Sequence, residues 1–71
     1  MEREKANFVI YIINELANKH NLYPSHVYKV LHETGCIGNF LVPLYDVLHT
    51  MSSQGICEDV EEYLMVRGAS L

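Results

Sequence analysis

The longest apolar run in the chain, residues 8–13, lies near its beginning and is flanked by polar residues without glycine or proline. Its β-branched and aromatic residues favour a strand on propensity alone. Positions with helical spacing nevertheless continue beyond the run on both sides. They are Ala6, Val9, Ile10, Ile13, Leu16, Ala17 and His20. Acidic residues come first and basic residues last, which suits a helix dipole. We therefore predict a helix over residues 3–20 that ends at Asn21 in a left-handed conformation.

Phe8 and Ile12 lie beside this predicted core face and form a second apolar stripe. A helix that is apolar over so much of its circumference needs cover on more than one side. We expect that another helix, or another copy of the protein, covers the Phe8 and Ile12 stripe.

Two further segments carry clear helix signals. Pro24, which suits the first position of a helix, and Gly35, which suits its end, delimit a helix over residues 24–34. The last helix is predicted over residues 53–67, with Ser52 and Ser53 as candidate N-caps. Its first half is acidic, in keeping with the dipole.

The segment between these helices, residues 36–50, is ambiguous. Its apolar residues keep a helical phase throughout, but Pro43 removes a backbone donor and disfavours a helical conformation at Val42. Two interpretations remain open. One is a short helical turn near 36–41 followed by a helix from about 43 to 49, which we prefer; the other is one helix kinked at Pro43.

The chain has 71 residues, which predicts one helical domain, residues 1–71. The fold class is all-α: a single small bundle of four to five helices with helix-turn-helix-like pairing around Gly35. A chain of this size is close to the lower limit for an adequate core, so a partner would help it.

Charge and cysteine usage restrict the classes of partner and compartment. Five Lys and Arg stand against nine Asp and Glu, and no Lys or Arg occurs between Glu33 and Val66. This balance disfavours nucleic acid, so a helix-turn-helix-like regulator is only the alternative function. The apolar run is too short for a membrane span or a secretory signal. Cys36 and Cys57 are expected as free apolar residues in a reducing cytoplasm.

The sequence gives little support for metal binding or catalysis. A zinc site needs three or four converging ligands, and helix-end or surface positions account for His20, His26, His32 and His49. Cys36, His49 and Asp46 are the ingredients of a thiol nucleophile, but so short a chain has little material for a deep pocket. We expect no enzyme, metal or cofactor site.

The five tyrosines are more informative. Tyr11 and Tyr28 flank the apolar stripes of their helices, where an aromatic residue closes the edge of a core or anchors an interface. Together with Phe8 and Ile12 they form a predicted interface, used in a homo-oligomer or with another protein.

The most distinctive stretch is Pro43-Leu44-Tyr45-Asp46-Val47-Leu48-His49-Thr50. With Val27-Tyr28-Lys29-Val30-Leu31 and Gly35-Cys36-Ile37 upstream, the chain resembles, over nearly its whole length, a small bacterial family known as domain of unknown function 3791. The resemblance implies a compact all-helical fold without an established activity. It also implies an accessory or antitoxin-like role beside an ADP-ribosyltransferase-like protein encoded nearby.

Two roles are open for the polar residues of this stretch, Tyr45, Asp46, His49 and Thr50. In the structural role, Asp46 accepts backbone N–H bonds in the first turn, and His49 and Thr50 close the helix and bond the following loop. In the interaction role, the four residues present a polar ridge to a partner. The function predicted from the sequence is a protein–protein interaction module.

Overall fold

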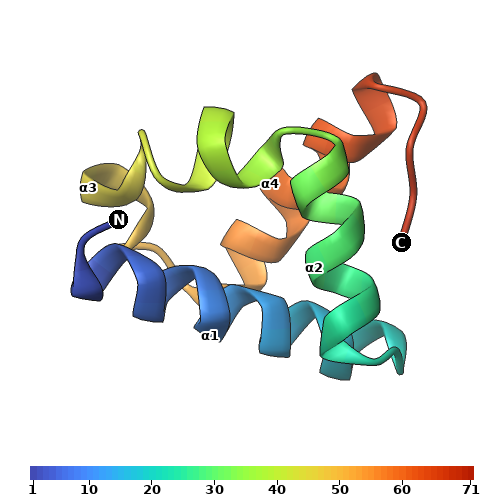
Figure 1. Cartoon of the computed structure of the whole chain (residues 1–71), viewed down its shortest axis with the longest axis horizontal. Coiled ribbons are helices and arrows are strands. Elements are labelled where there is room, and N and C mark those ends of the chain that lie inside the picture. Colours follow the sequence, from blue (N-terminus) through green and yellow to red (C-terminus); the bar gives the residue numbers. More distant parts are fainter.

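The computed structural model describes residues 1–71 and consists of helices joined by short turns (Figure 1). The elements are α1 (Arg3–His20), α2 (Pro24–Glu33), η1 (Ile37–Leu41), α3 (Tyr45–Leu48) and α4 (Ser53–Val66). The predicted all-α bundle of four to five helices is confirmed. In Figure 1, α1 runs along one side, α2 rises steeply from its C-terminal end, and α3 lies over its N-terminal end.

The core face of α1 is rotated relative to the sequence prediction. Ile12 is fully buried and Phe8 is only 9% exposed, whereas Ile10 is 56% exposed. Of the two expected covers for the Phe8 and Ile12 stripe, another helix is the one observed, so the assignment of Phe8 and Ile12 to an interface with a partner is wrong. The bundle itself covers that side, and the Tyr45 ring of α3 meets the Phe8 ring edge-on at 5.3 Å between centroids.

The ends of the long helices follow local chemistry. Asn21 adopts the left-handed conformation (φ 55°) that was predicted to end α1, and its N–H donates to the Ala17 carbonyl. At the start of α4, Gly55 N–H donates to the Ser52 hydroxyl oxygen at 3.2 Å, so Ser52 is the N-cap. Both signals depend on residues only three or four positions away in the sequence, which explains why they could be predicted from it.

The ambiguous segment forms two short elements, as preferred. η1 is a wide π-type turn in which Val42 N–H donates to the Ile37 carbonyl five residues back, at 3.0 Å. Val42 stays helical (φ −72°, ψ −50°) despite the proline that follows, so the expected conformation of Val42 is wrong. The break falls instead at Leu44 (φ −100°, ψ 14°), and α3 begins only at Tyr45.

The core is closed by side chains of a single chain. Fifteen residues are buried, and all of them are apolar. No buried side-chain nitrogen or oxygen lacks a hydrogen-bond partner. Because the interior needs nothing further, a functional surface has to be sought among the apolar side chains that remain on the outside.

Candidate interaction surfaces

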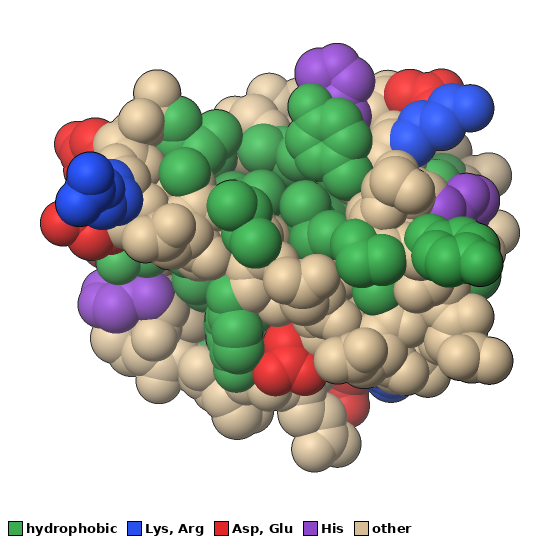
Figure 2. Space-filling view, turned by 60° about the horizontal axis from the view of Figure 1, so that its bottom comes forward, with side chains coloured by type: hydrophobic (Ala, Val, Ile, Leu, Met, Phe, Trp, Pro, Cys, Tyr) green, Lys and Arg blue, Asp and Glu red, His purple; other side chains and the backbone are tan.

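The first exposed apolar surface is a groove between α1, α2 and the start of η1, which we call the α1–α2 groove. It has a volume of about 400 Å³. Figure 2 shows hydrophobic side chains spread over the α1 side of the molecule, with charged side chains at the two ends of that side and acidic side chains also at its lower middle. The groove itself contains no Lys, Arg, Asp or Glu. It is lined by Met1, Ala6, Val9, Ile10, Ile13, Tyr28, His32 and Ile37.

The second surface, the α3–α4 groove, has a volume of about 430 Å³ and differs in charge. Two valines stand out from its apolar side chains: Val47 is 62% exposed and Val66 is 74% exposed. Two carboxylates, Asp59 and Glu62, line the same groove, and neither takes part in an ion pair. Its remaining lining residues are Phe40, Leu44, Leu48, Met51, Tyr63 and Arg67.

Arg67 forms no ion pair with these carboxylates, although it lines the same groove. Its guanidinium carbon lies 3.5 Å from the centroid of the Tyr63 ring, and its Nη1 donates to the Tyr63 carbonyl at 3.3 Å. Such a cation–π contact holds the cation over the ring. The α3–α4 groove therefore combines an apolar floor with two unpaired carboxylates and one cation held against Tyr63.

The polar ridge predicted on α3 is partly used within the helix. His49 Nδ1 donates to the Tyr45 carbonyl at 2.8 Å, and the Thr50 hydroxyl donates to the Val47 carbonyl at 2.8 Å. Both bonds run back into α3, so His49 and Thr50 close the helix as the structural role predicted. They do not bond the following loop, and that part of the structural role is wrong. Asp46 accepts no backbone N–H, so that part of the structural reading is wrong as well. The ridge as a partner surface stays a prediction.

The tyrosines of the predicted interface lie on the surface. Tyr28 is 49% exposed, lines the α1–α2 groove and stacks on His32, with 5.6 Å between ring centroids. Tyr11 is 48% exposed and lines neither groove. Sequence reasoning missed Ile10 and Val47, because helical spacing placed the first on the core face and gave the second no special signal.

The two cysteines have the environment of core residues. Burial raises the pKa of the Cys36 thiol to about 12, and burial also raises the pKa of Cys57. A thiol with so high a pKa is a poor nucleophile and a poor metal ligand at neutral pH. No hydrogen bond joins Asp46 to His49. His32 lies four residues before Cys36 in the sequence, and its ring stacks on the ring of Tyr28. No three His, Cys, Asp or Glu side chains converge on a point where they would hold a metal ion.

One charged cluster ties the end of α1 to α4. Lys19 Nζ lies 2.9 and 3.0 Å from the two carboxylate oxygens of Glu61, and His20 Nε2 lies 2.6 Å from Oε2. Burial by itself raises the pKa of Glu61, but the hydrogen bonds from Lys19 and His20 together outweigh it and lower that pKa. The hydrogen bond to Glu61 raises the pKa of Lys19. All three side chains link α1 to α4.

No helix in the structure is both long enough and apolar enough to cross a bilayer.

Comparison with known proteins gives one match. A family model described as a protein of unknown function (DUF3791) matches residues 7–67. The matched range begins in the second turn of α1 and ends just after α4, so it contains the whole of the α3–α4 groove. No curated protein and no solved structure matches the chain.

Proposed function

The chain belongs to the DUF3791 family, and we propose that it is a protein–protein interaction module acting as an accessory, antitoxin-like partner of an ADP-ribosyltransferase-like protein. One observation carries the proposal: the α3–α4 groove exposes apolar side chains beside two carboxylates that form no ion pair.

The groove favours a particular kind of ligand. An amphipathic helix binds by laying its apolar face in such a groove, and charges at the edge select its orientation and partner. Asp59 and Glu62 favour a helix with Lys or Arg beside its apolar stripe. We therefore propose that the enzyme presents a basic amphipathic helix to this groove.

One polar residue of α3 extends the same surface. Thr50 is exposed three residues after Val47, on the same side of the helix. Polar side chains around an apolar centre are typical of an interface rim. In this proposal Thr50 belongs to the rim of the partner site that contains Val47, whereas Tyr45 and His49 lie on the other side of α3, where Tyr45 meets Phe8.

The experiment uses the protein encoded next to this chain, which we expect to be ADP-ribosyltransferase-like, co-purified with it and titrated by calorimetry. We expect a stable complex, and we expect Val47→Glu to weaken it about 30-fold or more, because the new carboxylate is desolvated in an apolar contact. Met65→Glu is the matched control: Met65 is 70% exposed on α4 but does not line the groove.

Failure of the two wild-type proteins to associate at about 50 μM would overturn the proposal, since that affinity is weaker than a dedicated partner needs. Equal effects of Val47→Glu and Met65→Glu would place the contact elsewhere and overturn the assignment of the groove. Inhibition of NAD turnover by the wild type, relieved in Val47→Glu, would support the antitoxin-like role.

The alternative of a nucleic-acid-binding regulator gains no comparable support. Of the five Lys and Arg, Lys19 is bound to Glu61 and Arg67 lies over Tyr63. The others are divided between the start of α1 and the middle of α2. Because backbone affinity for nucleic acid comes from gathered cations, we do not propose this function.

The cysteines bear on the compartment. Both are free and buried. Unpaired thiols are typical of a reducing environment, and we place the protein in the cytoplasm on that ground.

A further inference from the structure

The α3–α4 groove carries charges of both signs, and all of them come from α4 and its C-cap. Asp59 and Glu62 lie within α4, and Arg67 is the C-cap that follows its last residue. No other Asp, Glu, Lys or Arg of the chain lines the groove. In the direction of α4 the groove is therefore acidic first and basic at the end of the helix.

We propose that the partner helix bound in this groove matches this polarity with two charged side chains of opposite sign. An Asp or Glu pairs with Arg67, and a Lys or Arg seven residues further on pairs with Asp59 and Glu62, with apolar side chains between them. A uniformly basic helix would instead place a cation against Arg67. This inference rests on the proposed function, because it specifies the helix that the partner presents to the same groove.

The spacing follows from the geometry of α4. A helix rises about 1.5 Å per residue, so Arg67 lies roughly 7–8 Å along the axis from Glu62 and about 12 Å from Asp59. Side chains seven residues apart on a partner helix lie on one face, about 10 Å apart along its axis. Two such side chains therefore reach the carboxylate pair and the guanidinium at the same time.

Arg67 is fixed in a position to bind a carboxylate. The Tyr63 ring below its guanidinium is itself held, because the Tyr63 hydroxyl donates to the Thr34 carbonyl at 3.3 Å and the Phe40 ring lies 5.5 Å away. One of the five N–H donors of Arg67 is used on the Tyr63 carbonyl, and no carboxylate of the chain pairs with the others. Little rotamer freedom is thus left to lose when a partner's carboxylate binds.

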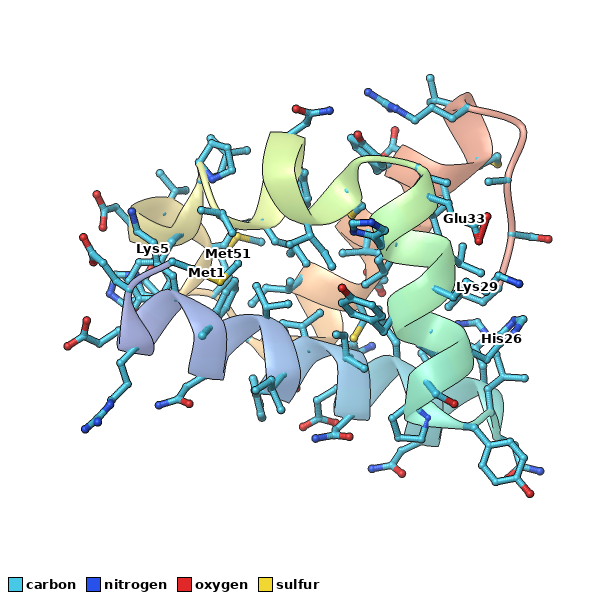
Figure 3. The ribbon with its side chains drawn as sticks, viewed as in Figure 1. Met1, Lys5, His26, Lys29, Glu33 and Met51 are labelled. Carbon is cyan, nitrogen blue, oxygen red and sulfur yellow. The ribbon has the colours of Figure 1, made fainter.

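Charged side chains outside the groove form no ion pair with the three that line it. In Figure 3, Lys5 extends from the first turns of α1 and Glu33 from the last turn of α2, and neither lines the groove. Glu61 is bound by side chains of α1. Asp46 and Glu58 are also outside the lining, and both are acidic. The groove therefore keeps its single cation at the C-terminal end of α4.

The order of the two charges along the partner helix follows from helix dipoles. Acidic side chains stabilise the N-terminus of a helix and basic side chains its C-terminus, so the acidic residue comes first in a stable helix. With this residue at Arg67, the partner helix runs antiparallel to α4. Opposite ends of the two macrodipoles then lie next to each other, which is also favourable.

The probe is a labelled amphipathic peptide helix with an apolar stripe, a glutamate and, seven residues later, a lysine. Fluorescence anisotropy at low salt should show saturable binding to the full chain, with a dissociation constant below about 1 mM. Replacing the peptide glutamate by glutamine should weaken binding about 3–10-fold with the wild type but not with Arg67→Gln, as a double-mutant cycle of a direct pair requires. Lys29→Gln is the matched control, because Lys29 is a cation outside the groove.

The same cycle tests the other end of the groove. Replacing the peptide lysine by glutamine should weaken binding with the wild type but not with the double variant Asp59→Asn/Glu62→Gln. Because these side chains form no ion pair within the chain, circular dichroism should show native helix content in every variant.

Several outcomes would overturn the inference. They are a peptide without measurable binding, a glutamate effect of equal size with Arg67→Gln, and tighter binding when a lysine replaces the peptide glutamate. Equal binding of a peptide with its two charges exchanged would overturn the antiparallel direction. An enzyme that binds through Val47 while the Arg67 coupling is absent would refute this inference alone. A coupled peptide beside an enzyme that does not associate would refute the proposed function alone.

Discussion

Gly35 and Gly38 are three residues apart, yet their backbones have opposite requirements. Gly35 has φ +78°, and a Cβ there would lie 2.7 Å from Asn39 Nδ2. Gly38 lies within η1, and a Cβ there would meet nothing within 4 Å. The first glycine is required by its backbone conformation, while the second only increases the freedom of the unfolded chain.

We therefore predict opposite effects of the same substitution at these positions. Gly35→Ala should lower the free energy of unfolding by about 1–2 kcal/mol, since alanine is strained at positive φ and crowds Asn39. Gly38→Ala should raise it by about 0.4–1 kcal/mol. Urea denaturation of the two variants and the wild type measures both changes. Destabilisation of similar size at both positions would contradict the reading of η1.

Residue-level predictions from the sequence succeeded where the cause is local. Asn21 and Ser52 act through backbone groups four and three residues away, and spacing alone identifies them. Ile10 and Ile12 show the limit. Both are isoleucines two positions apart on one helix, and which of them is buried depends on where α3 and α4 pack. That choice is not contained in the periodicity of α1.

At the scale of elements, the Lys19–His20–Glu61 cluster makes the attachment of α4 to α1 sensitive to pH. The pKa of Glu61 is lowered in the folded protein from an ordinary value of 4.5. A lowered carboxyl pKa contributes stability that is fully present above the unfolded value and is lost as the pH falls through the folded value. The contribution of Glu61 should thus disappear as the medium is acidified below about pH 4.5.

Glu61→Gln tests this link. The variant should be less stable than the wild type at pH 7, and the difference should shrink toward zero as the pH is lowered below about 4. Glu62→Gln is the control, because Glu62 is next in sequence but forms no ion pair. Thermal unfolding across a pH series gives the comparison. If the Glu61→Gln difference did not change with pH, the cluster would not be coupled to folding.

The bounds of α1, α2 and α4 agree with the sequence prediction within one residue at each end. The segment before α3 was harder to predict, because a proline indicates that a helix breaks but not at which residue it breaks. The wide turn of η1 lets Val42 remain helical by bonding Ile37, and this moves the break to Leu44. A π-type turn depends on how Leu41 and Leu48 reach the core, which the local sequence does not encode.

At the scale of the whole molecule, the two grooves explain why the candidate surfaces could be predicted only in part. The sequence indicated an acidic chain with apolar residues left over, and it singled out Tyr28. It could not separate an uncharged groove from an acidic one, because Ile10 and Tyr28 come from α1 and α2, and Val47 and Glu62 from α3 and α4. Each groove forms only when the helices that line it pack together.

The buried thiols allow folding and association to be measured together. Cys36 is fully buried and its pKa is raised to about 12, and Cys57 is 3% exposed. At pH 8 a thiol reagent should therefore modify both at least about 100-fold more slowly than in urea, at a rate set by transient opening. Rapid labelling of Cys36 in the native protein would contradict its position in the core.

The same reaction tests the homo-oligomer predicted from the sequence. An oligomer that forms only from folded chains lowers the population of the open state by mass action. The labelling rate of the wild type should therefore fall as the protein concentration rises. A rate that does not change with concentration would show that folding is complete within one chain. A rate that falls would show that the surface left over by this small core is itself part of what stabilises the fold.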